Sequence, residues 1–139
     1  MATAQKFNQF VEDLAKGVHN LSTGQLKVAL TNTAPVAANS VYADLTSPLA
    51  TTNLSGATPF NVTTTSAEQT SGTLSLVLAD LTLTATGAVG PFRYVVLYND
   101  TPTSPADPLI GWYDYGSSVT MANTETFLID FASTTITIA

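Results

Sequence analysis

The chain has 139 residues, the length of one ordinary domain, and it is poor in charge. Four Lys and Arg against ten Asp and Glu give a net charge of -6, and charged residues make up only 10% of the chain. Proteins bind duplex nucleic acid through clustered cations, so these few, scattered cations argue against a nucleic-acid partner. The absence of Cys excludes disulfides, thiolate metal sites and cysteine nucleophiles.

Thr, Ser, Asn and Ala take the place of the missing charges. Because hydroxyl groups cost less to bury than charges, this composition suits a protein whose exterior is covered by partners. An ordinary β-protein with an uncharged polar surface is an equally good interpretation. No apolar run reaches the length of a membrane span and no secretion signal begins the chain, so we expect no membrane partner.

The first predicted element is a short helix, within a segment that covers residues 1–17. Four apolar residues follow the period of one helix face: Phe7, Phe10, Val11 and Leu14. Glu12 and Asp13 are placed on the opposite face, and Gly17 predicts the C-terminal stop. A helix this short needs a surface to pack on. We therefore expect this face either to contact another chain or to cap the core of its own domain.

Residues 18–139 are predicted to form one β domain. The expected strands are Leu26–Thr31, Val41–Leu45, Phe60–Thr65, Leu74–Leu78, Leu81–Leu83, Phe92–Tyr98, Leu109–Tyr115, Glu125–Phe131 and Thr135–Ile138. This series predicts an all-β fold, a jelly-roll-like antiparallel β-sandwich with one short N-terminal α-helix.

Two strand patterns carry more detail. Leu78 and Leu81 differ in parity, so the strand is expected to bulge or to pass between sheets at Ala79-Asp80. The segment Phe92–Tyr98 is apolar on both faces, which is typical of a central strand covered on both sides.

Few side chains in this sequence are candidates for catalysis or metal binding. His19 is the single histidine and is interpreted as a packing or capping residue, because one His without Cys cannot supply the usual zinc ligands. No Asp or Glu has a sequence context that indicates a catalytic carboxylate pair. A loop calcium site using Asn99, Asp100 and Asp107 is an alternative, because calcium takes oxygen ligands. We expect no enzymatic activity, no catalytic residue and no cofactor.

Aromatic residues gather on two successive predicted strands: Tyr94, Tyr98, Trp112, Tyr113 and Tyr115. The favoured interpretation is core or subunit interface, with Trp112 as the core anchor. Tyr113 and Tyr115 therefore join the helix face as candidate protein contacts, because tyrosine is common in interface hot spots. The alternative is an exposed platform on which sugar rings stack.

Four sequence segments resemble a known family: residues 10–21 (FVEDLAKGVHNL), 26–35 (LKVALTNTAP), 90–100 (GPFRYVVLYND) and 108–116 (PLIGWYDYG). Over nearly its full length the chain resembles capsid cement (decoration) proteins of short-tailed bacteriophages. The resemblance implies a protein that is assembled in the host cytoplasm, binds the outer surface of the capsid and clamps neighbouring major capsid subunits. It implies a homodimer, or else a trimer, without a cofactor. A tail or head-fibre component and a carbohydrate-binding module are the alternatives.

Overall fold

The computed structural model describes residues 3–131 and 136–138, and its antiparallel sheets confirm the predicted all-β fold with one short helix. The elements are β1 (Gln5–Lys6), α1 (Asn8–Ala15), β2 (Leu26–Thr31), the 3-10 helix η1 (Tyr42–Asp44), β3 (Asn61–Val62), β4 (Thr64–Thr70), β5 (Thr73–Leu78), β6 (Leu81–Thr84), β7 (Val89–Asn99), β8 (Leu109–Met121), β9 (Thr126–Ile129) and β10 (Ile136–Ile138). The jelly-roll topology stays a prediction.

The larger sheet has five strands in the order β1-β8-β7-β2-β3. β7 lies in its centre and is hydrogen-bonded to β8 on one side and β2 on the other. Val95, Val96 and Leu97 of β7 are all buried, so both faces of this strand are covered. The predicted central strand is confirmed, and so are the predicted bounds of β2.

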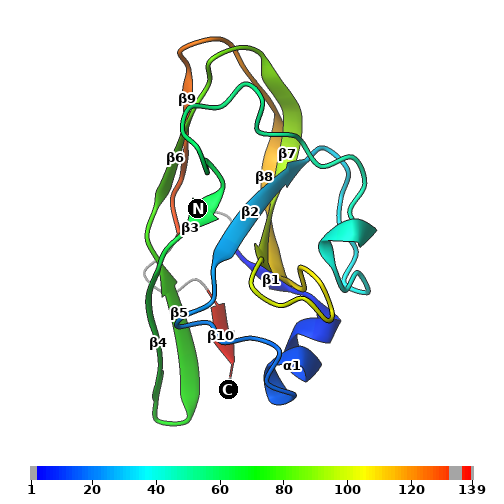
Figure 1. Ribbon diagram of the computed structural model, residues 1–139, viewed down its shortest axis with the longest axis vertical. Helices are drawn as coiled ribbons and strands as arrows, with labels where there is room; N and C mark the ends of the chain where they lie inside the picture. Colours follow the sequence, from blue (N-terminus) through cyan, green and yellow to red (C-terminus); the bar gives the residue numbers. More distant parts are fainter. Residues whose placement is uncertain (1–2, 132–135, 139) are drawn as a thin grey trace.

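The second layer is built from strands that change partner halfway. β5 pairs with β4 and β10, whereas β6, which follows it directly, pairs with β9. Phe131 N–H donates to the Asp80 carboxylate across the break, at 2.9 Å. The predicted change at Ala79-Asp80 is therefore confirmed. Figure 1 shows β4, β5, β6 and β9 on the left and β2, β7 and β8 on the right.

Buried side chains fill the space between the two layers and continue on the outer face of the larger sheet at Val96 and Trp112, and α1 lies at the lower end of the molecule (Figure 1). Phe7 and Phe10 are almost completely buried there, and the Phe7 ring lies 4.6 Å from the ring of Trp112. Trp112 is itself buried, which confirms its predicted role as a core anchor. The segment 1–17 thus gives this core a strand and two large side chains.

The orientation of the helix differs from the prediction. Val11, expected on the packing face, is 48% exposed, whereas Asp13, expected on the polar face, is only 4% exposed. The buried side of α1 follows Phe10 and Asp13, because Gln9 donates to the Asp13 carboxylate and reduces the cost of burying it. Gly17 has φ +76°, a left-handed conformation that favours glycine, so the predicted stop is confirmed.

Several predicted strands also differ from the structure, and β9 is shorter than the predicted Glu125–Phe131. Val41–Leu45, predicted as an edge strand, contains η1 instead, because the Asp44 carboxylate accepts the backbone N–H groups of residues 40 and 41 and closes a helical turn. The predicted strand Phe60–Thr65 is divided between β3 and β4, and β8 continues beyond Tyr115 to residue 121. Thr135, the predicted start of the last strand, lies outside the described residues.

Candidate functional site

A large bulge interrupts the pairing of β8 with β7. Tyr94 lies opposite Asp114 and Phe92 lies opposite Val119, so the four residues 115–118 stand opposite Arg93 alone. Extra residues in one strand re-aim its side chains. Tyr115, the first residue of this bulge, is 56% exposed, although Tyr113 two positions earlier is buried.

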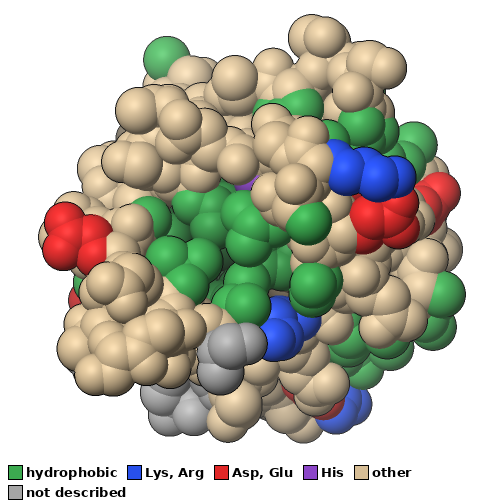
Figure 2. Space-filling view, turned by 90° about the horizontal axis from the view of Figure 1, so that it is seen from below, with side chains coloured by type: hydrophobic (Ala, Val, Ile, Leu, Met, Phe, Trp, Pro, Cys, Tyr) green, Lys and Arg blue, Asp and Glu red, His purple; other side chains and the backbone are tan. Residues whose placement is uncertain are grey.

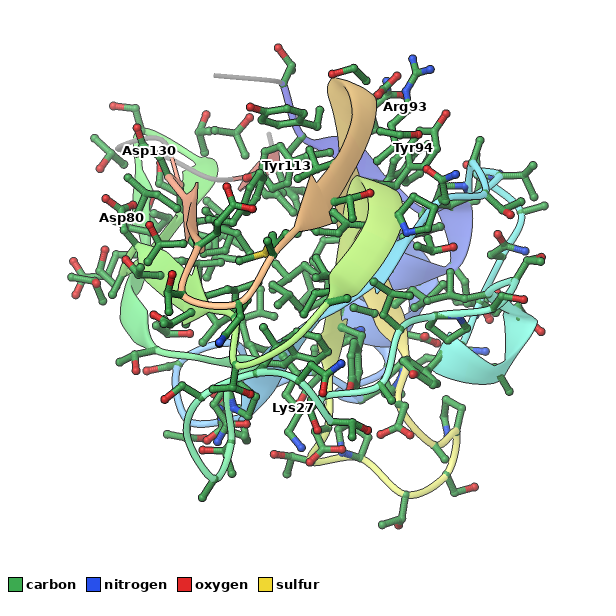
Figure 3. All side chains as sticks on the ribbon, turned by 90° about the horizontal axis from the view of Figure 1, so that it is seen from above. Lys27, Asp80, Arg93, Tyr94, Tyr113 and Asp130 are labelled. Atoms are coloured by element: carbon green, nitrogen blue, oxygen red, sulfur yellow. The ribbon has the colours of Figure 1, made fainter. Side chains whose placement is uncertain are left out.

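A salt bridge at the base of the bulge fixes its shape. Arg93 donates from Nε and Nη2 to the two Asp114 oxygens, at 2.7 and 3.0 Å. Gly116 N–H donates to the same carboxylate at 2.8 Å. Hydrogen bonds from Arg93 and then from Gly116 lower the pKa of Asp114, so this carboxyl stays ionised at neutral pH. In Figure 3, Arg93 and Tyr94 lie on one side of β8 and Tyr113 on the other, towards β9.

An apolar hollow of about 310 Å³ opens between the bulge and β9. It is lined by Val95, Tyr113, Tyr115, Phe127, Leu128, Ile129 and Asp130. The Phe127 ring stands edge-on to Tyr115 with 5.2 Å between ring centres, and Leu128 is 55% exposed. We call Tyr115, Phe127, Leu128 and the hollow beneath them the docking face. An exposed aromatic beside an apolar hollow suits contact with another protein.

A second apolar surface lies at the lower end of the sandwich. Figure 2 shows hydrophobic side chains gathered in a depression there, between tan loops and a few charged groups. Leu14 of α1 and the paired residues Leu74 and Ile138 are partly buried against the core at this end. Of the predicted contact face of the helix, only Val11 and Leu14 keep accessible surface, and both lie at this end.

The structure therefore divides the six candidate contact residues. Phe7, Phe10 and Tyr113 are buried in the chain's own core, so the alternative in which the helix face caps the core is correct for the two phenylalanines. Val11, Leu14 and Tyr115 keep exposed surface. The prediction missed Leu128, although the alternation of Phe127 and Ile129 already placed it on the outer face of β9.

His19 is buried and packs on the Phe10 ring at 5.2 Å, in agreement with the predicted packing role. The Asn99 side-chain nitrogen lies 3.2 Å from His19 Nδ1. Asn99 is itself fully buried, and its side-chain oxygen Oδ1 accepts a hydrogen bond from Thr101 N–H. The Asn99 side chain therefore stabilises the fold and does not face a cation in the loop. In residues 3–131 and 136–138, no group of three or more His, Asp and Glu is placed to hold a metal ion.

Comparison with protein-family models, with curated proteins and with solved structures finds no match to this chain. None of the described helices is long and apolar enough to cross a membrane. The docking face and the lower end are thus characterised by their own geometry: exposed apolar side chains, shallow hollows and few charges.

Proposed function

We propose that this chain is a capsid cement protein, which binds the outer surface of a phage shell and clamps neighbouring major capsid subunits. The resemblance to decoration proteins along nearly the full chain supports this function. The low charge also supports this function, because burying a neutral surface between subunits costs less desolvation free energy than burying charged groups. Its site of action is the outside of the virion, and it works without a cofactor or a catalytic step.

The β8 bulge is the observation that carries the proposal. It presents the ring of Tyr115 at the rim of a hollow that Leu128 also lines, and both side chains are more than half exposed. Covering such apolar surface gains about 25 cal/mol per Å², from which the cost of association is subtracted. The docking face therefore contacts the major capsid protein, and the lower end, with Val11 and Leu14, contacts a second copy in a homodimer.

Co-sedimentation with empty shells of the corresponding phage tests the docking face. The double variant Tyr115→Ser, Leu128→Ser is expected to bind shells at least tenfold more weakly, with an unchanged melting temperature, since both side chains are exposed. Val36→Ser is the matched control, because Val36 is 57% exposed and does not line this hollow. Full occupancy by the double variant would contradict the proposal.

Copy number separates cement from a tail or head-fibre component. Quantitative mass spectrometry of purified virions should find on the order of hundreds of copies for a protein that covers an icosahedral shell, and about a dozen or fewer for a tail protein. Trp112 is buried against Phe7, so the carbohydrate-binding alternative would have to use the neighbouring tyrosines.

A further inference from the structure

A second hollow lies on the face of the larger sheet that points away from the second layer, the face that also carries Val96 and Trp112. The long connection between β2 and β3 crosses this face and is tied to β2 by Leu49 N–H, which donates to Leu30 C=O, and by Phe60 C=O, which accepts Val28 N–H. Between this connection and the sheet, a space of about 330 Å³ stays open. That volume is at the lower end of the range for small-ligand sites, about 300–1,000 Å³.

Three adjacent strands line up polar side chains along the floor of this hollow. Lys27 of β2 is the register partner of Tyr98 in β7 and of Asn61 in β3. Register partners project from the same face of a sheet, on strands about 4.8 Å apart. A phenol, an ammonium and a carboxamide therefore lie side by side, and all three residues line the hollow.

Aromatic rings form one wall. The rings of Tyr42 and Tyr98 have centres 5.0 Å apart and are inclined at 50°. Burial raises the pKa of both phenols, so each keeps its hydroxyl proton at neutral pH. The hollow thus combines an apolar ring surface with neutral hydroxyl groups.

One hydrogen-bond acceptor in the hollow is unused within the described residues. The Asn61 side-chain oxygen is buried and accepts no hydrogen bond from any group in residues 3–131 or 136–138. Buried acceptors are almost always paired, so this oxygen is suited to a donor from outside the chain.

The charges around the hollow decide which class of ligand fits. Lys27 is the cation, and its Nζ lies 3.1 Å from an Asp100 oxygen, so its charge is already compensated. Asp107 lies close to Asp100, and its pKa is raised by burial and by a hydrogen bond with that carboxyl group. An anionic ligand would meet these carboxyl groups without a free cation in return. A neutral ligand that carries several hydroxyl groups meets no such penalty.

We propose that this hollow binds one neutral saccharide unit, with a hydroxyl donated to Asn61 Oδ1 and the ring against Tyr42. The proposal goes beyond the cement function, because no residue that the structure describes lines both this hollow and the one at the docking face. A chain fixed to a shell through the docking face would hold a glycan at a separate site.

Titration of the intact protein with methyl β-D-glucopyranoside, methyl β-D-galactopyranoside and methyl N-acetyl-β-D-glucosaminide tests the site, with N-acetylneuraminic acid as the anionic probe. The readout is the two-dimensional amide NMR spectrum, which reports the Asn61 side-chain NH₂ and the backbone of Lys27 and Tyr98. At least one neutral glycoside should shift these signals saturably at concentrations up to roughly 50 mM. The anionic probe should bind at least tenfold more weakly.

Two variants and one control make the result specific. Asn61→Ala and Tyr42→Leu should each weaken binding of the neutral glycoside about tenfold, whereas Tyr115→Ser at the docking face should leave it unchanged. The same spectra show whether each variant is folded, and Tyr42→Leu replaces Asn61→Ala if β3 is disturbed. Absence of any shift with all three glycosides, shifts elsewhere in the fold, equal binding of the anionic probe, or full affinity in both variants would overturn the proposal.

Discussion

His19 shows how a single buried polar residue joins the helix to the larger sheet. Its ring packs on Phe10 of α1, and its Nδ1 lies within hydrogen-bonding distance of the Asn99 side chain at the end of β7. Burial lowers the pKa of His19, and the nearby Asp13 carboxyl opposes part of this shift. The neutral imidazole is therefore the form that the fold stabilises.

This burial predicts a stability that depends on pH. Because the pKa of His19 is lower in the folded chain than in the unfolded one, the unfolded chain takes up a proton first, and stability is lost as the pH falls below about 6.5. Urea unfolding at about pH 7.5 and pH 5.5 should show the loss. His19→Gln should show a smaller difference between the two conditions. An equal difference in this variant would mean that another group is responsible.

The helix α1 is the element whose role changes most between sequence and structure. Its eight residues bury Phe10 and leave Val11 exposed, so the same helix closes the core and presents a small outer surface. Deleting residues 1–17 is therefore not a clean test of docking, because this deletion removes β1 and the buried Phe7 together with the helix.

Two substitutions one residue apart should separate these roles. Phe10→Ala is expected to cost about 3–5 kcal/mol, because it leaves a cavity beneath α1. At dilutions where the chain is monomeric, Val11→Asp should change stability by less than about 0.5 kcal/mol, because this side chain is not packed in the chain's own core. Urea denaturation with constant m-values is the measurement. Similar losses in the two variants would show that α1 packs differently.

Local alternation was sufficient to predict much of the fold, including β2, the central strand β7 and the change of partner at Ala79-Asp80. The bulge at Tyr115 was not predictable, because it depends on the register of β8 against β7 and not on the residues of β8 alone. Likewise, the burial of Asp13 depends on the fold around α1, and no local pattern reports it. The proposed saccharide hollow was not predictable either, since it depends on how the long connection between β2 and β3 folds back over the sheet.

Across the whole molecule, the cations are largely compensated by nearby carboxylates. Ion pairs join Lys16 to Glu12, Lys27 to Asp100 and Arg93 to Asp114. Among the described residues, Asp130 is the single charged one that lines the docking hollow. The proposed contact through this face would therefore rely on apolar area and shape.

Shell binding should consequently depend little on salt. Between about 0.05 and 0.5 M NaCl we expect the affinity to change less than about twofold, because screening weakens charge–charge contacts and leaves apolar burial intact. Co-sedimentation across this range measures it. A tenfold loss of affinity would instead indicate a charged seam on the capsid and a different contact face.

The pairing of β1 with β8 has a consequence for how the chain completes its fold during synthesis. Gln5 lies opposite Trp112 and Lys6 opposite Gly111, so the first strand must wait for partners roughly a hundred residues later in the chain. Until those residues leave the ribosome, Phe7 has no Trp112 ring to pack against. The lower end of the sandwich therefore closes late, and a newly made chain keeps Phe7 unpacked until Trp112 has been synthesised.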